Sequence, residues 1–380
     1  MRLTLLLLAD IHIGNIGDSQ YVKAILTDIL QKEAYTKKVD MIVILGDFFD
    51  RLINLSSDNS EVAFNIMHLL SLISKVNNTK IRIIYGTESH EMNQYKSFNH
   101  YLDEDKSDIK IINKVTEEDI DGIKILYMPE EYMYNKREYY KDTLYNDNKH
   151  YNYIFLHGMI DDGLPLQMRE RKSKTNNKEK KVPHFNCKEL GDRCDLCVAG
   201  HYHIHTIMPN NVHYLGSLFR SCFGEEQPKG YGTVVDDKLT FVENDRALTY
   251  NTYTFNESDN IYKSEDNLIK EINRIKKKHS SLFNGETGGK IRLIFNIPIN
   301  PDISFKEVIN DLLKEEKKIQ VVIKNNSDKL LETVKSEVDS KWNYLLDPQI
   351  STVSKIANYI KDMNNIDLKE EEINKYIGGT

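Results

Sequence analysis

The chain has 380 residues, more than one ordinary hydrophobic core accommodates, so two domains or one domain with a large appendage are expected. Hydrophobic residues make up 40% and charged residues 29%, a globular composition that excludes extensive disorder. The formal net charge of −7 argues against coating of nucleic acid by bulk electrostatics, but it does not exclude a local basic groove.

The leucine-rich opening segment, residues 3–9, is interrupted by Asp10 and His12 before it could form a signal peptide or span a membrane. It is therefore expected to be a buried strand. The 4 cysteines are too few for a disulfide framework, and no segment points to export, so a cytoplasmic location is expected. Cys194 and Cys197 lack a second cysteine pair, and we interpret them as buried apolar residues of a strand rather than zinc ligands.

Short apolar runs alternate with helical patterns through the first half of the chain. The runs are rich in Leu, Ile and Val, and they cover residues 3–9, 41–45, 81–85, 123–126, 153–156 and 196–200. Between them, residues 20–36 and 60–76 carry apolar side chains at helical spacing. Buried strands covered by helices predict a layered α/β fold for a first domain at 1–245.

The pattern changes after about residue 245. The sequence predicts a helix at 264–278, a strand at 290–297, a helix capped by Ser304 and Glu307, and a strand at 319–323. This order indicates a small α/β capping domain at 246–327, which we expect to contact DNA. A C-terminal helical region follows at 328–380, almost wholly helical over 328–377.

Five short segments at the ends of predicted strands carry side chains suited to hard metal ions. They are Asp10-Ile-His12, Gly46-Asp47 with Asp50 and Arg51, Ser89-His90-Glu91, His157-Gly158, and Gly200-His201-Tyr-His203. Each segment alone is weak evidence, but their succession after strands predicts a metal centre. Two cations about 3.5–4 Å apart need a bridging carboxylate and a mixture of oxygen and imidazole ligands. Asp47 suits the bridge.

The order of these segments resembles that of the calcineurin-like metallophosphoesterases, which implies a layered β-sandwich flanked by helices. Within that superfamily the chain resembles the SbcD branch, nuclease subunits that work with an SbcC-type ATPase in DNA repair or recombination. The segments Tyr214-Leu-Gly216-Ser217 and Pro228-Lys229-Gly230-Tyr231 support that branch. The resemblance in motifs covers about residues 1–245, and beyond them it rests on layout only.

The resemblance also implies roles for individual side chains. One metal ion would be held by Asp10, His12, Asp47 and His203, and the other by Asp47, the residue at 89, His157 and His201. His90 would lie beside the scissile phosphate, where it stabilises charge or donates a proton. Asp50 either orients a histidine ligand or only pairs with Arg51. Manganese is the implied ion, although oxygen and imidazole ligands also suit Fe²⁺.

The third segment departs from the usual G-N-H-(D/E) pattern of the family. Gly86-Thr-Glu-Ser-His-Glu inserts two residues and places Ser89 where the asparagine would bind metal. Three alternatives follow: the Ser89 hydroxyl substitutes, Glu88 turns inward, or the second metal binds loosely. The Ser-His-Glu order favours Ser89, because it preserves the position of His90.

For function, the resemblance implies manganese-dependent exonuclease action on duplex ends and endonuclease action on single strands, by in-line attack of a metal-bound hydroxide. The alternatives are a stand-alone phosphoesterase for a cyclic nucleotide or phosphoprotein, and a weakly catalytic scaffold that tethers DNA. The long extension beyond the catalytic fold favours the nuclease. Candidate DNA contacts are Arg51, Arg171, Lys172 and Lys174, although the basic stretch 169–181 is equally consistent with a solvated loop.

Two apolar stripes in the C-terminal region require burial. The first, at 329–345, includes Trp342 and is expected to pack within the chain. The second follows Asp347-Pro348 and includes Val353, Ile356 and Ile360. We expect this second helix to dock in a groove of the SbcC-like coiled-coil ATPase, as the resemblance implies. A homodimer is also expected.

Overall fold

The computed structural model describes residues 2–16, 18–102, 107–163, 181–298, 305–314, 316–325 and 351–364. The chain divides into two compact units, Met1–Asn251 with Ser281–Ile291, and Thr252–Ser280 with Arg292–Thr380. This division does not test the predicted boundaries at residues 245 and 327. The helix predicted at 329–345 and the candidate DNA contacts Arg171, Lys172 and Lys174 lie outside the described residues.

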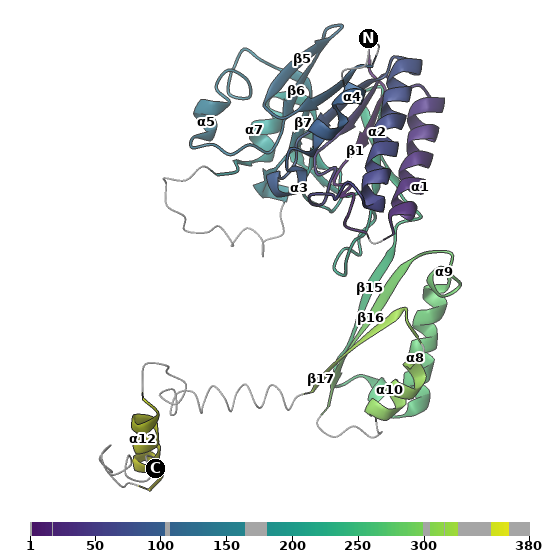
Figure 1. Cartoon of the computed structure of the whole chain (residues 1–380), viewed down its shortest axis with the longest axis vertical. Coiled ribbons are helices and arrows are strands. Elements are labelled where there is room, and N and C mark those ends of the chain that lie inside the picture. Colours follow the sequence, from purple (N-terminus) through teal and green to yellow (C-terminus); the bar gives the residue numbers. More distant parts are fainter. Residues whose placement is uncertain are drawn as a thin grey trace. The chain divides into compact units, whose positions relative to one another are not determined.

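The first unit is a sandwich of two six-stranded sheets (Figure 1). One sheet has the order β14 (Lys238–Glu243), β13 (Gly230–Val235), β1 (Leu5–Leu8), β2 (Met41–Ile44), β3 (Lys80–Ile84), β4 (Ile109–Ile112). The other has the order β11 (Thr206–Met208), β12 (Val212–Tyr214), β10 (Cys194–Gly200), β7 (Tyr151–His157), β6 (Ile123–Met128), β5 (Thr116–Ile120). Strands β1 to β4 are parallel, and so are β6, β7, β10 and β12.

The alternation of side chains along β1 accounts for the layers. Leu5 and Leu7 belong to the core between the sheets, whereas Leu6 and Leu8 pack under the helices on the outer face. Both faces are buried, which explains the uninterrupted leucine run. Helices α1 (Ser19–Ile29) and α2 (Asp58–Asn77) cover the first sheet, and α7 (Cys187–Gly191) packs on the second. The predicted α/β layered sandwich is thus confirmed.

Two local predictions for this unit have different outcomes. Cys194 and Cys197 are buried on β10, as predicted. The segment predicted as one helix at 20–36 is α-helical only to Ile29 and continues as a π-helix over Leu30–Thr36. Glu33 in that π-helix is buried and accepts a hydrogen bond from Tyr231 of β13 at 3.2 Å, a partner that no local sequence pattern reveals.

The second unit contains most of the sheet β15 (Thr249–Phe255), β16 (Gly289–Ile297), β17 (Ile319–Asn325), with helices α8 (Glu265–Lys278) and α10 (Phe305–Leu313); the first residues of β15 and β16 belong to the first unit. Phe295 stacks on Phe255 with ring centroids 5.0 Å apart and meets Phe305 edge-on at 4.9 Å. The predicted helix-strand-helix-strand order is confirmed, while β15 was not predicted. A further helix, α12 (Thr352–Asn364), matches the predicted C-terminal helix.

The remaining described elements are short. They are α3 (Glu88–Glu91), α4 (Asn99–Leu102), α5 (Lys136–Tyr139), α9 (Ser280–Phe283), β8 (Met159–Ile160) and β9 (His184–Phe185), together with 3-10 helices at Gln94–Phe98, Asp161–Gly163, Pro209–Asn211 and Asn260–Tyr262. No helix in the described part of the chain combines the length and the apolar character that crossing a membrane requires.

Candidate metal centre

The two sheets present polar side chains where their parallel strands end. Asp10 follows β1, Asp47 follows β2, and His201 follows β10 directly, while His157 is the last residue of β7. Loops at the carboxyl ends of parallel strands converge, so residues distant in sequence meet there. Potential ligand atoms lie within 4.8 Å of one another in the groups Asp10, His12, His203 and Asp10, Asp47, His157.

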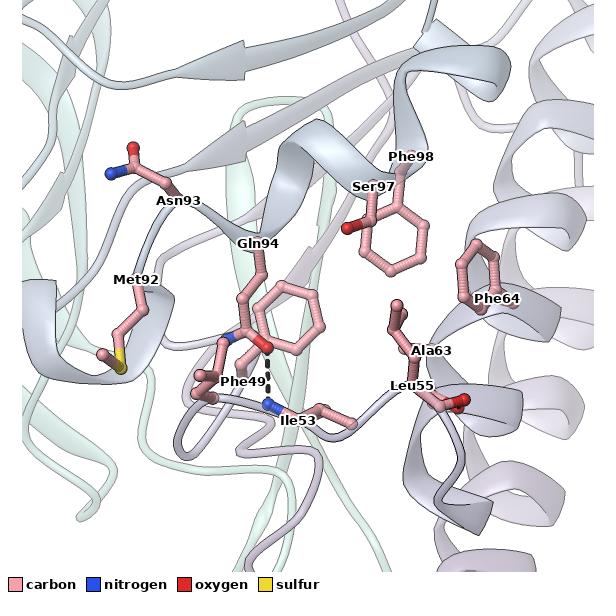
Figure 2. A pocket seen from close by; sticks show the side chains of 12 residues that line it. Phe49, Ile53, Leu55, Ala63, Phe64, Met92, Asn93, Gln94, Ser97 and Phe98 are labelled. Carbon is pink, nitrogen blue, oxygen red and sulfur yellow. Dashed lines mark hydrogen bonds between the residues drawn. The ribbon is translucent and has the colours of Figure 1, made fainter.

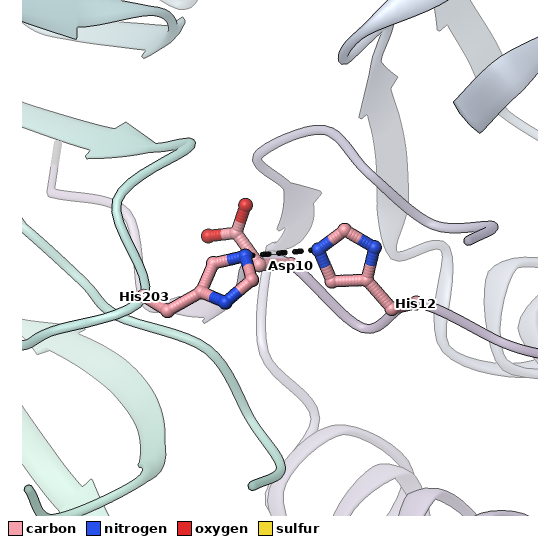
Figure 3. A group of neighbouring side chains, drawn as sticks. All are labelled: Asp10, His12 and His203. Atoms are coloured by element: carbon pink, nitrogen blue, oxygen red, sulfur yellow. Dashed lines mark hydrogen bonds between the residues drawn. The ribbon is translucent and has the colours of Figure 1, made fainter. Parts of the chain in front are cut away.

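The first of these groups is drawn in Figure 3. The Nε2 atoms of His12 and His203 are 3.0 Å apart, beside the carboxylate of Asp10. Asp10 is almost fully buried and accepts a hydrogen bond from the backbone N–H of His201 at 2.9 Å. Facing imidazole nitrogens beside a buried carboxylate form a donor set that fits a divalent cation.

The ring of His203 is oriented by Glu225. Its Nδ1–H donates to Glu225 Oε1 at 2.7 Å, so the Nε2 of the neutral ring is free to bind a metal. Burial lowers the pKa of His203, but this hydrogen bond raises it overall. Burial raises the pKa of Glu225, and the same hydrogen bond brings it down to about 2. Sequence reasoning missed Glu225, and no local pattern marks it.

His157 is fully buried and has a fixed orientation. Its Nδ1–H donates to the carbonyl of Leu45 at 2.7 Å, which directs Nε2 toward Asp47 Oδ2 at 3.5 Å. Asp47 Oδ2 also lies 3.7 Å from His12 Nε2. Asp47 therefore lies between the two groups of histidines, as a bridging carboxylate must.

Charge couples Asp47 and His157. Burial lowers the pKa of His157, but the Asp47 carboxylate raises it to about 10. Burial raises the pKa of Asp47, but His157 and His12 hold it well below its ordinary value. Binding of a cation at Asp47 and protonation of His157 are therefore competing ways to compensate the buried carboxylate.

A carboxylate that was not predicted joins this side of the site. Glu130 follows β6, and its Oε2 lies 3.3 Å from His201 Nδ1 and 4.0 Å from His157 Nε2. Glu130, His157 and His201 form a further group of potential ligands. The signal that identified the other ligands, a polar residue just beyond a buried strand, was also present here.

The third predicted segment forms the short helix α3. Ser89 and Glu88 are exposed on α3, and within the described residues Glu88 belongs to none of the groups of potential ligands. Thr87 instead faces the centre: its backbone N–H donates to Asp47 Oδ1 at 2.7 Å. Thr87 is the N-cap of α3 and Glu88 is its first residue, so Ser89 lies within this short helix with an exposed side chain. Its role as a metal ligand stays a prediction.

His90 and Asp50 lie beside the centre. The Nδ1–H of His90 donates to the backbone carbonyl of Asp50, and the His90 ring lies 5.0 Å from that of His12. The Asp50 carboxylate reaches His12 Nδ1 at 3.6 Å and accepts a hydrogen bond from Arg51 Nε at 2.6 Å. The pairing of Asp50 with Arg51 is thus present, whereas His12 Nδ1 has no hydrogen-bond partner among the described residues, and orientation of His12 by Asp50 stays a prediction. Gln94 ties this loop to α3, donating to the carbonyls of His90 at 3.1 Å and Arg51 at 3.0 Å.

A cavity of about 250 Å³ lies on another side of the same loop (Figure 2). Its lining is mostly apolar and comes from Phe49, Leu52, Ile53, Leu55, Ser60, Ala63, Phe64, Met92, Asn93, Gln94, Ser97 and Phe98. Gln94 Oε1 accepts a hydrogen bond from the backbone N–H of Ile53 at 2.7 Å, shown as a dashed line. The cavity includes none of the clustered ligands and is separate from the metal centre.

The backbone at the centre is strained. Asp10, His12 and Asp47 have φ values of 47°, 51° and 48°, and His201 has 92°. Such values are uncommon for residues other than glycine and gather at functional sites. Gly46 has a φ of 84°, and a Cβ there would lie 2.2 Å from His157 Nδ1. This glycine lets Asp47 and His157 approach each other.

Comparison with known proteins agrees with this geometry. A family model described as calcineurin-like phosphoesterase matches residues 3–205, a span that contains all the clustered residues. The chain belongs to this family and is a metal-dependent phosphoester hydrolase. No curated protein matches. Among 48 matching solved chains, one is 12% identical with a TM-score of 0.35, and the alignment covers 64% of this chain and 99% of that chain.

Proposed function

We propose that the chain is a two-metal DNA nuclease of the SbcD type. The observation that carries the proposal is a contact between the two segments that resemble that branch. Lys229 is fully buried, and its ammonium group donates to Ser217 Oγ at 2.9 Å and to the carbonyl of His203 at 2.8 Å. A buried ammonium needs such partners, so this contact fixes the loop that carries a candidate ligand.

The residues present fit two divalent cations, and we propose manganese. Asp10, His12, Asp47 and His203 would hold one ion, and Asp47, His157 and His201 would contribute to the other. When bound, the ions supply an activated water for in-line attack and offset charge on the phosphate. Asp47 and His157 would bind the ions in a fixed orientation. The backbone N–H of Thr87 holds the other carboxylate oxygen of Asp47, and the backbone carbonyl of Leu45 holds Nδ1 of His157.

His90 and Arg51 are assigned to the phosphodiester itself. The backbone carbonyl of Asp50 fixes His90 Nδ1, which leaves Nε2 for the scissile phosphate or the leaving oxygen. The Arg51 side chain is 67% exposed while its guanidinium pairs with Asp50, so it can contact a neighbouring DNA phosphate.

We propose that α12 contacts an SbcC-like ATPase and that the nuclease works as a homodimer. Support for the docking helix is its apolar stripe: Val353, Ile356 and Ile360 are only partly buried. Deletion of residues 348–380 should leave manganese-dependent cleavage of single-stranded DNA near normal and abolish ATP-stimulated cleavage with the ATPase. Continued co-purification of the truncated protein with that ATPase would contradict the docking role.

The substrate decides between the nuclease and a stand-alone phosphoesterase. Purified protein with manganese is offered labelled linear duplex DNA, single-stranded circular DNA, a cyclic nucleotide and a phosphopeptide. We expect cleavage of both DNA substrates, with release of nucleotides from duplex ends. Hydrolysis of the cyclic nucleotide or phosphopeptide without DNA cleavage would refute the nuclease. Tight DNA binding without hydrolysis of any substrate would favour the tethering scaffold.

A further inference from the structure

The metal group that includes His157 and His201 has a carboxylate within reach. Glu130 contacts both histidines, with its Oε2 at 3.3 Å from His201 Nδ1 and 4.0 Å from His157 Nε2. Its side chain is only 2% exposed. Within the described residues no lysine or arginine forms an ion pair with it, although a buried carboxylate requires a compensating charge.

The backbone and a neighbouring hydroxyl fix Glu130 in this position. The backbone N–H of Glu130 donates to the carbonyl of Tyr85 at 3.2 Å, which joins the end of β6 to the end of β3. The Thr87 hydroxyl donates to Glu130 Oε2 at 3.3 Å. Thr87 also binds Asp47 through its backbone N–H, so one residue orients both carboxylates.

We propose that Glu130 is a direct ligand of the second metal ion and takes the role that the family's third segment gives to an asparagine. The assignment rests on the proposed two-metal function and refines it. The ligands of that ion are then Asp47, Glu130, His157 and His201. A carboxylate in place of a neutral ligand binds a hard cation more tightly and leaves one less positive charge at the phosphate.

The test measures manganese binding to metal-stripped full-length protein by titration calorimetry, together with the electron paramagnetic resonance spectrum of the bound ions. Wild type should bind two equivalents and give the spectrum of a coupled pair. Glu130→Gln, which keeps the size of the side chain, should lose one equivalent or bind it at least about tenfold more weakly, and should give the spectrum of an isolated ion. Glu130→Asp should recover part of the affinity.

Two control variants test the alternatives at the third segment. Glu88→Gln and Ser89→Ala change exposed side chains on α3 and should leave both equivalents and the coupled spectrum unchanged. The far-ultraviolet circular dichroism of each metal-free variant verifies folding. Wild-type binding by Glu130→Gln, or loss of an equivalent in Ser89→Ala or Glu88→Gln, would overturn the assignment. A wild-type protein without a manganese pair would instead refute the two-metal function on which it rests.

Discussion

Two groups of buried charged side chains lie in the sandwich. In one, the complete group, the chain itself supplies the oppositely charged partners; in the other, the incomplete group, it does not. Arg82 on β3 is fully buried and binds both oxygens of Glu118, at 2.7 and 2.8 Å, and Asp108 at 2.8 Å. At the strand ends, Asp47 and Glu130 face only imidazole nitrogens within the described ion pairs. A complete group holds the fold together, whereas an excess of buried carboxylates is suited to added cations.

The largest effect is expected at the shared carboxylate of the incomplete group. Asp47→Ala should abolish manganese-dependent DNA cleavage, because Asp47 lies between the two groups of histidines. The protein should stay folded, since no arginine or lysine of the described chain depends on Asp47 as an ion-pair partner. Cleavage rates and circular dichroism measure both outcomes. Retention of a tenth of the wild-type rate, one decade, would remove Asp47 from the bridge.

Removal of a member of the complete group should lower the stability of the folded protein. Arg82→Met leaves Glu118 and Asp108 without their buried partner and should lower the free energy of unfolding by about 3–5 kcal/mol. Lys110→Met is the matched control: Lys110 binds the same Glu118 oxygen at 2.8 Å but is 55% exposed, so its loss should cost less than about 1 kcal/mol. Urea unfolding measures both. Equal losses would show that burial does not distinguish these two ion pairs.

A variant of His90 tests whether this side chain, which lies beside the incomplete group, acts on the phosphate. His90→Ala should lower turnover by about 10²-fold and leave manganese stoichiometry unchanged, because the predicted role of His90 is at the leaving oxygen. Single-turnover cleavage and calorimetry separate the two properties. If the variant loses a metal equivalent, His90 belongs among the ligands, which its grouping with His12 and Asp50 would then explain.

The candidate ligands that stand at the ends of buried strands were the part of the site that the sequence predicted best. Asp10, Asp47 and His157 follow or end buried apolar strands, and parallel pairing then brings them together. Glu225 was missed because its importance depends on a contact with His203 that no local pattern marks. Glu130 also follows a buried strand, but it belongs to none of the five segments on which the prediction was based.

Two further features depend on more than a local sequence pattern. The family pattern favoured Ser89 as a ligand by its order beside His90; Ser89 is exposed on α3, and its role as a ligand stays a prediction. The strand β5 has only one buried residue, Ile120, and so lacks the apolar run by which β1 was identified.

A smaller effect is expected at the residue behind His203. Glu225→Gln should weaken the affinity for one manganese ion by about tenfold, because the carboxylate orients the ring and increases the basicity of its metal-binding nitrogen. The second equivalent, bound on the side of His157, should be unaffected. Calorimetric titration resolves the two. An equal loss of affinity for both ions would mean that the two halves of the centre do not bind manganese independently.

The smallest effect is the pH dependence that the complete group gives to stability. Burial raises the pKa of Glu118, but its hydrogen bonds with Arg82 and Lys110 bring it down to about 2, below the ordinary value of 4.5. The ionised carboxylate thus contributes stability that is fully present above pH 4.5 and is lost as the pH falls toward 2. Other carboxylates show similar trends, so the measurement is the difference in unfolding free energy between wild type and Glu118→Gln. This difference should shrink by about 1 to 2 kcal/mol between pH 5 and pH 3. A difference that stays constant over this range would mean that Arg82 does not hold Glu118 in its ionised form.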